Sequence, residues 1–218
     1  AEPATQALAA AGLEPLSLVE KEGLALVNGT QGMMAVGILA AERVRRLTRA
    51  ADVAAAMTVE AVFGTDRAFD ERLQALRPHP GQAASAANLR RLLAASPIIA
   101  SHRDSDHLVQ DAYSLRCAPQ VHGATRDVLA YASAVLEVEA SSVSDNPIVL
   151  PDDDEVLSGG NFHGQPVAVA LDALALATVG TAGISERRLY RMLDPATSHG
   201  LPAFLVRDSG VNSGFMLA

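Results

Sequence analysis

The strongest constraint on the fold is a long stretch, Gln31 to Phe63, that contains no proline and consists mainly of helix-forming residues. Two further stretches, 119–143 and 164–193, have the same character, and each carries its only proline near the start, where the first turn of a helix tolerates it. Shorter helices are expected over 67–76 and 82–95. Three long helices of this kind predict a bundle.

Other segments predict short elements or loops. The spacing Ser17-x-x-Glu20 matches a capping box and predicts a short helix that begins there. Residues 98–116 are expected to form an extended loop with broken turns. Apolar residues on both sides of Asp152-Asp153-Asp154 predict one small β-hairpin. The expected fold class is therefore all-α, a long-helix bundle with one small β-hairpin.

The segment 166–184 is almost entirely apolar, which raises the question of a membrane span. Asp172 lies within it, and a charge inside a membrane is costly, so we expect a helix buried among other helices and no membrane association. A helix that is apolar all round needs more cover than one chain of 218 residues supplies. A larger parent chain, an oligomer, or both are therefore expected.

Composition limits which partners and which cellular compartment are expected. The net charge is −8 and Lys21 is the only lysine, so no basic surface for nucleic acid is expected. Cys117 is the only cysteine and cannot form an internal disulfide, which favours a reducing cytoplasm. The first residues are acidic and lack the apolar run of a secretory signal. We expect a cytoplasmic protein whose partner is a small molecule.

The best chemical cluster consists of Gln110, Tyr113 and Arg116, spaced three residues apart. On a helical turn such residues share one face, so they are candidates for one pocket. Arg116 offers a planar set of donors for a carboxylate, Tyr113 a phenol for proton transfer, and Gln110 an amide for orientation. The spacing alone favours the alternative, a solvated turn with Arg116 at the surface.

Two other segments are candidates for a site. In Gly159-Gly160-Asn161-Phe162-His163-Gly164, the paired glycines permit a close backbone approach and Phe162 can present its ring as a wall. A flexible loop with Phe162 in the core is the alternative. Asn28, before Gly29 and Thr30, either caps a helix or lies beside a ligand.

A third cluster contains two histidines and two aspartates, His102, Asp104, Asp106 and His107. These are metal-ligand types, and a metal-dependent hydrolase is one alternative function. Hydrolases with a similar run hold it at the edge of a sheet, and no such sheet is predicted here. We therefore expect a charged solvent loop and no metal.

Several motifs occur together in a fixed order, and together they resemble the middle portion of the aromatic amino acid ammonia-lyases. The resemblance covers essentially the whole chain, and His163 after Phe162 and the residues around Cys117 are more similar to the histidine-specific members than to the phenylalanine or tyrosine ones. The motifs are Asn28-Gly29-Thr30-Gln31, the run Gln110 to Val121, Ser144-Asp145-Asn146-Pro147, Gly159 to Gly164, and Asn212-Ser213-Gly214-Phe215-Met216.

The resemblance implies a chemistry and an assembly. Members of this family remove ammonia from an α-amino acid with a 4-methylidene-imidazole-5-one (MIO) ring, formed from an Ala-Ser-Gly tripeptide of their own backbone. It implies that Asn28 lies beside this ring, Phe162 packs near it, and Arg116 binds the substrate carboxylate with Gln110 and Tyr113 close by, Tyr113 handling a proton. It also implies a homotetramer of fumarase-like helical type, in which different subunits contribute to each site.

The chain departs from the family pattern in one respect, because it contains no Ala-Ser-Gly sequence. We interpret residues 1–218 as the central helical domain of a larger lyase, with the MIO-bearing part expected upstream and a C-terminal part downstream, and we expect this part alone to be inactive. The expected reaction of the parent is L-histidine to urocanate and ammonia. Alternatives are a tyrosine or phenylalanine ammonia-lyase, an aminomutase, a fumarase-type lyase, or a non-catalytic helical scaffold.

Overall fold

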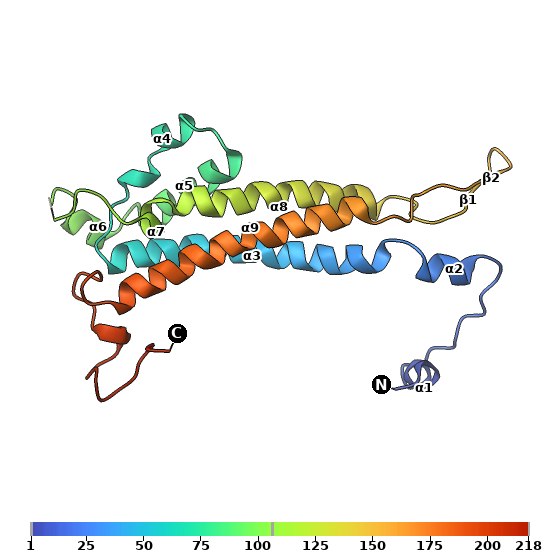
Figure 1. Cartoon of the computed structure of the whole chain (residues 1–218), viewed down its shortest axis with the longest axis horizontal. Coiled ribbons are helices and arrows are strands. Elements are labelled where there is room, and N and C mark those ends of the chain that lie inside the picture. The colour runs from blue at the N-terminus through green and yellow to red at the C-terminus, as the bar shows by residue number, and fades with distance from the viewer. Residues whose placement is uncertain (1, 106, 218) are drawn as a thin grey trace.

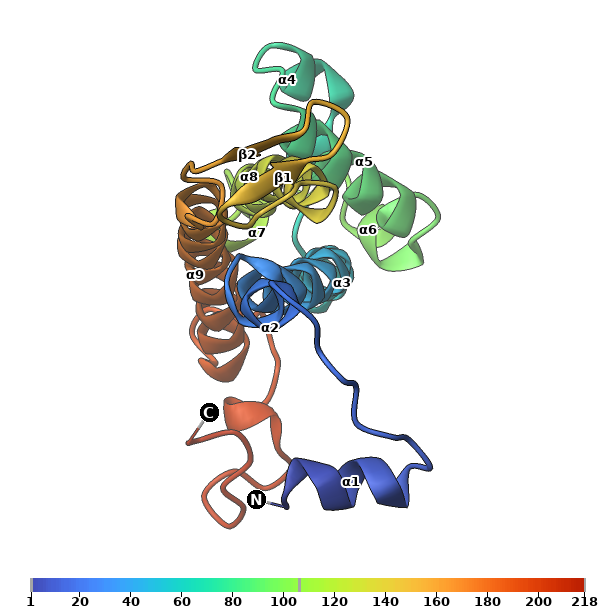
Figure 2. The ribbon, with the colours of Figure 1, turned by 90° about the vertical axis from the view of Figure 1, so that its right-hand side faces the viewer.

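The computed structural model describes residues 2–105 and 107–217. Its body consists of three long helices, α3 (Gln31–Ala61), α8 (Ala118–Ala140) and α9 (Gln165–Leu193). They lie side by side along the long axis of the molecule, and the end-on view shows them bundled with α5 (Pro80–Leu93) against α8 (Figures 1 and 2). The predicted all-α bundle is confirmed.

The small hairpin is also confirmed. Strands β1 (Ile148–Leu150) and β2 (Glu155–Leu157) pair antiparallel, with Val149 opposite Val156. The hairpin projects beyond the end of α8 (Figure 1). The remaining elements are short: α1 (Ala4–Ala10), α2 (Glu22–Val27), η1 (Arg67–Phe69), α4 (Glu71–Ala75), α6 (Pro97–Ser101), α7 (Tyr113–Arg116) and η2 (Ala203–Leu205).

Three local predictions are wrong in detail. No helix begins at Ser17; α2 begins at Glu22, whose carboxylate accepts a hydrogen bond from the Val19 amide at 3.0 Å. The helix expected over 67–76 is interrupted at Asp70, which has an extended ψ of 135° and caps α4 by accepting from the Arg72 amide. The loop expected over 98–116 contains the helices α6 and α7.

Apolar packing forms two clusters along the bundle. One lies around α5, α6 and α7 and contains the fully buried Phe69, Leu89 and Leu115. The other joins α3, α8 and α9 through small and medium side chains, among them Ala41, Leu136, Ala132, Val167, Ala170 and Leu174. Small residues at these positions permit close helix packing, which is why the long helices stay in contact along most of their length.

A buried polar group lies between the two clusters and links three helices. Asp52 of α3 is 1% exposed. Its carboxylate accepts hydrogen bonds from His122 of α8 at 2.8 Å, from Arg126 of α8 at 2.6 Å and from Asn88 of α5 at 2.8 Å. Because the three donors satisfy it, the buried charge holds the helices in one register instead of forcing them apart.

This group predicts a dependence of stability on pH. Burial by itself raises the pKa of Asp52, but the hydrogen bonds from His122, Asn88 and Arg126 outweigh it and hold that pKa below its usual range. A carboxyl with a lowered folded-state pKa stabilises the protein above its unfolded pKa of about 4, and this contribution is lost as the pH falls through the folded value. Urea unfolding at several pH values should show stability falling on acidification.

The matched variants are Asp52→Asn and Asp172→Asn, since Asp172 is an exposed carboxylate on α9. Asp52→Asn should be less stable at neutral pH and show a shallower acid dependence than wild type, whereas Asp172→Asn should keep the wild-type slope. Equal slopes in all three proteins would contradict the role given to Asp52.

Large apolar side chains remain exposed along the long helices. On α3 and α9 they include Val36 (68% exposed) and Leu176 (75% exposed). Two segments, Glu22–Ala61 and Gln165–Leu193, are long and apolar enough to cross a membrane by length and composition alone. Within the most apolar 18 residues of each segment, only 17% and 22% are buried. These faces are thus available to a partner.

Candidate functional site

The predicted site residues lie at two opposite ends of the bundle. Asn28 and Phe162 lie at the end where α3 and α9 begin, beside the hairpin, whereas Tyr113 and Arg116 lie on α7 at the other end (Figure 1). Helix α3 runs between them, and a helix of its length spans about 45 Å at 1.5 Å per residue. A single chain therefore does not bring the two halves together.

The hairpin end gathers three of the sequence motifs. Asn28 caps the C-terminus of α2, and Gly29 has a φ of 141°, which favours glycine. A Cβ at Gly29 would collide with the carbonyl of Ser144, so the 28–31 and 144–147 motifs touch. The ion pair with Lys21, the amide of Asn146 and the side chain of Asn28 hold the pKa of Asp145 below its usual range.

The glycine-rich motif lies at this same end. The Gly159 amide donates to the side chain of Asn146 at 2.8 Å, and Gly164 packs against Met33 at the start of α3. Phe162 is 40% exposed, so its ring is not a core residue. Added Cβ atoms at Gly159 and Gly160 would meet nothing within 4 Å, which leaves the backbone here open to another group.

The second half of the site is built on α7. The Arg116 guanidinium stacks over the Tyr113 ring, with Cζ 4.7 Å from the ring centroid. Tyr113 is 72% exposed, and the Nε of Arg116 is buried with no hydrogen-bond partner among the described residues. A buried guanidinium donor without an acceptor is costly, and a carboxylate is the acceptor that suits it best. This end can therefore bind a carboxylate beside a phenol.

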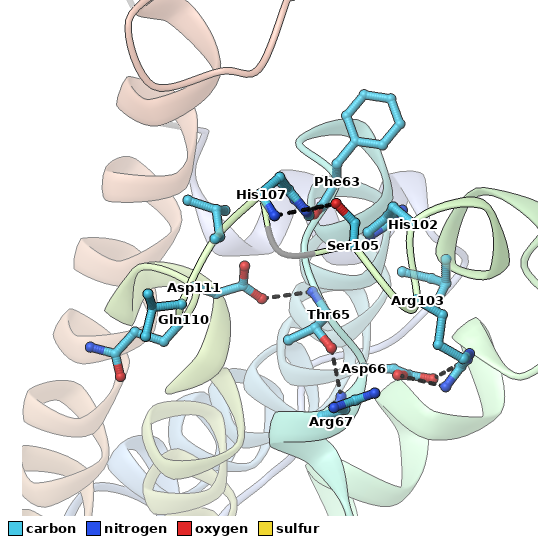
Figure 3. A pocket seen from close by; sticks show the side chains of 13 residues that line it. Phe63, Thr65, Asp66, Arg67, His102, Arg103, Ser105, His107, Gln110 and Asp111 are labelled. Carbon is cyan, nitrogen blue, oxygen red and sulfur yellow. Dashed lines mark hydrogen bonds and ion pairs between the residues drawn. The ribbon is translucent and has the colours of Figure 1, made fainter.

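Gln110 lies just before this helix, because α7 begins only at Tyr113. It lines a cavity of about 130 Å³ together with Thr65 and His107, and Figure 3 shows its side chain directed away from His107. The neighbouring Asp111 accepts a hydrogen bond from the Thr65 amide at 2.7 Å, which ties this loop to the end of α3. Tyr113 and Arg116 thus share a helical turn, while Gln110 lies in the loop that precedes it.

The histidine-rich loop forms no metal site among the residues that the structure describes. Both ring nitrogens of His102 face backbone carbonyls, those of Ile98 at 2.7 Å and Gly64 at 2.8 Å, and His107 faces the carbonyl of Phe63 at 3.0 Å. Asp106, one of the four residues of metal-ligand type in this loop, lies outside the described residues. The ring nitrogens here hold the loop in place, which gives no support to the hydrolase alternative.

One group of buried residues near α7 could not be predicted from the sequence. Arg188 of α9 is 2% exposed and donates to the Ser114 carbonyl of α7 at 3.3 Å and contacts His122 at 3.4 Å. A signal for it was present, since an arginine at this position interrupts the buried face of a helix. Its partners are distant in sequence, however, so the pattern gave no means of naming them.

Comparison with known proteins shows which family the chain resembles. The family model described as aromatic amino acid lyase matches residues 1–218. A histidine ammonia-lyase of Sorangium cellulosum is 56% identical over 221 residues, which cover 99% of this chain and 43% of that protein. The chain thus spans less than half the length of the curated relatives it matches.

Solved structures agree with this assignment. A crystal structure of histidine ammonia-lyase from Trypanosoma cruzi matches with a TM-score of 0.85 and 45% identity, covering 97% of this chain and 39% of that one. Tyrosine aminomutase from Streptomyces globisporus matches with a TM-score of 0.89 and 40% identity, covering 97% and 44%. The match along the whole chain and the shared helical fold lead to one conclusion: the chain belongs to the aromatic amino acid lyase family.

Proposed function

We propose that the parent protein is a histidine ammonia-lyase that converts L-histidine to urocanate and ammonia without a redox step. The observation that carries this proposal is the pair on α7, where the Nε of Arg116, buried and without a partner in the described part of the chain, lies beside the exposed phenol of Tyr113. The similarity to relatives named histidine ammonia-lyase, at 53–56% identity, favours L-histidine over other aromatic amino acids.

Each residue at the α7 end has a distinct role in this proposal. Arg116 binds the substrate carboxylate with two donors of its guanidinium, which fixes both position and orientation. Tyr113 lies against that guanidinium and handles a proton next to the bound amino acid. Gln110 approaches from the preceding loop and orients the substrate through its amide.

The hairpin end supplies the opposite wall. Asn28 would lie beside the substrate amine, and the exposed ring of Phe162 would limit the motion of the prosthetic group. The open backbone at Gly159 and Gly160 fits the approach of such a group. When bound there, MIO supplies the electrophile that makes the amine a better leaving group. Its Ala-Ser-Gly precursor does not occur in residues 1–218 and would come from another part of the parent protein.

In this proposal, the hairpin end of one copy and the α7 end of another copy form the two walls of one active site. Copies that pack antiparallel along α3 and α9 would place the hairpin end of one beside the α7 end of the next and cover the exposed apolar side chains. Lipid is a poor alternative for α3, because its middle carries Glu42, Arg45 and Arg46. We propose a homotetramer with shared active sites.

Cysteine content and net charge bear on the compartment and the partners of the protein. Cys117 is a free, half-buried cysteine, which suits a reducing cytoplasm. The substrate is a small amino acid, and the acidic net charge of −8 suits neither nucleic acid nor an anionic membrane surface. The proposed chemistry requires no metal.

The test is an assay of the full-length protein with L-histidine, L-tyrosine and L-phenylalanine, with products separated by chromatography. We expect urocanate from L-histidine and a much lower kcat/KM for the other two. Coumarate or cinnamate as the main product would move the protein to a tyrosine or phenylalanine lyase, and a β-amino acid would identify an aminomutase. No product from any of the three would contradict the proposal.

Phe162→Ala separates a wall of the active site from a core residue. Because the ring is 40% exposed and not part of either apolar cluster, we expect kcat to fall by about tenfold or more while the Tm changes little. Phe69→Ala is the contrasting variant, since Phe69 is fully buried and its truncation should cost about 3–5 kcal/mol. A lowered Tm with normal kcat for Phe162→Ala would place that ring in the core.

A further inference from the structure

Helix α7 has only four residues, Tyr113 to Arg116, and no side chain caps its N-terminus. A helix this short is unstable by itself, so its orientation depends on what holds it. Leu115 anchors it on the apolar side, where this side chain is 1% exposed. The second anchor is polar: the Ser114 carbonyl accepts a hydrogen bond from Arg188 Nη1 at 3.3 Å.

Arg188 is the largest fully buried side chain among the described residues. Burial lowers the pKa of its guanidinium to about 10, with Asp52 acting in the opposite direction, so it still carries a positive charge at neutral pH. Its Nη2 donates to the Ser185 hydroxyl at 3.0 Å and lies 3.4 Å from His122 Nε2. A buried charge with these partners has little freedom to move.

His122 connects this guanidinium to a carboxylate. Its Nδ1 lies 2.8 Å from Asp52, which as a carboxylate can only accept, so Nδ1 carries the proton. Its Nε2 lies 3.4 Å from Arg188 Nη2, which can only donate, so this nitrogen faces the guanidinium as the acceptor. The series Asp52, His122, Arg188 and Ser114 thus runs from α3 through α8 and α9 to α7.

We propose that Arg188 is a positioning residue that orients Tyr113 and Arg116 by fixing the backbone of α7 to the Asp52–His122 pair. The proposal rests on the proposed function for its effect on substrate, but not for its effect on α7. Arg188 itself is fully buried and acts through the helix that carries the binding residues.

The chain offers a matched control in Arg126. Arg126 donates directly to Asp52, with Nη2 at 2.6 Å, and its Nε donates to Ser85 at 2.8 Å, whereas Arg188 reaches Asp52 only through His122; no described bond connects the side chain of Arg126 to α7. Arg188→Met and Arg126→Met therefore disturb the same buried carboxylate, but only the first removes the donor to Ser114. Arg188→Lys is the conservative variant, because it keeps the charge and loses the planar fork.

The first measurement is hydrogen exchange of the full-length protein, followed peptide by peptide. We expect the amides of 113–117 to exchange about tenfold faster in Arg188→Met, with a smaller increase in Arg188→Lys and none in Arg126→Met. The middle of α8 should stay protected in all three. Equal effects of Arg188→Met and Arg126→Met on α7, or no effect of Arg188→Met, would overturn the proposal. So would failure of both Arg188 variants to fold, since Arg188 would then serve global stability.

The second measurement uses ligands with and without a carboxylate. In Arg188→Lys, binding of L-histidine and imidazolepropionate should weaken by about tenfold, while binding of histamine, which lacks the carboxylate, should change little. Parallel weakening of all three ligands would mark a general structural defect and overturn the proposal. If wild type binds and converts none of these compounds, the proposed function fails, and the exchange experiment still decides the role of Arg188.

Discussion

Arg116→Lys is expected to lower kcat/KM for L-histidine by about ten- to a hundredfold. The substitution keeps the positive charge but loses the planar fork, and one charge-assisted hydrogen bond contributes about 1.5–3 kcal/mol. Because Arg116 Nε is buried and has no partner within residues 2–105 and 107–217, no neighbouring acceptor there is left unsatisfied by its removal, and stability should change little. Steady-state kinetics together with a thermal melt measure both quantities.

The control for this variant is Arg187→Lys. Arg187 also stacks over a tyrosine, with its Cζ 5.0 Å from the ring centroid of Tyr190, but its guanidinium is exposed and already pairs with Glu186. The same chemical change should leave kcat/KM near the wild-type value there. If Arg116→Lys also kept wild-type kinetics, Arg116 would have no part in substrate binding.

Gly123→Ala is expected to destabilise the protein by about 3 kcal/mol or more, or to prevent folding, although alanine is the better helix former. Helices α5 and α8 approach each other at Gly81 and Gly123. A Cβ on Gly123 would collide with the backbone of Gln82 and lie 2.7 Å from the carbonyl carbon of Gly81. Neither backbone can move without separating the two helices. Urea unfolding measures the change.

Gly180→Ala is the matched control on α9. A Cβ at Gly180 would lie 3.6 Å from Val121, an ordinary van der Waals contact, so the substitution should stabilise the protein by up to about 1 kcal/mol. We expect the free energy of unfolding to fall in Gly123→Ala and to rise in Gly180→Ala. Because helix propensity favours alanine at both positions, a fall at Gly123 must come from the backbone contact. Two variants of similar stability would show that α5 and α8 are not held at this distance.

The long helices could be predicted from the sequence because their signal is local. Residues 31–61 carry no proline, and the observed α3 matches the expected stretch to within two residues at its end. Helix α7 was not predicted, since four residues hold no periodicity and its stability comes from Leu115 and Arg188. The capping box at Ser17 failed because the spacing fits a turn as well as a helix.

The candidate site could be predicted as a set of residues but not as a geometry. The spacing of three residues makes Tyr113 and Arg116 candidates for one face of a turn, and the family resemblance implies their roles. Asn28 and Phe162 lie at the end of α3 opposite to α7. This arrangement depends on how helices far apart in sequence pack together, which no local pattern predicts. The buried contacts of Asp52 with His122 and Arg126, 70 and 74 residues away, are missing from any local pattern for the same reason.

The central claim is that each active site combines the hairpin end of one chain with the α7 end of another. Co-expression of two inactive variants, Asn28→Ala and Arg116→Ala, on differently tagged copies of the full-length protein tests it most directly. If sites form between copies, random assembly leaves about a quarter of them with both residues intact, and the purified mixed oligomer should regain about a quarter of wild-type activity. A mixed oligomer as inactive as either parent would contradict the claim.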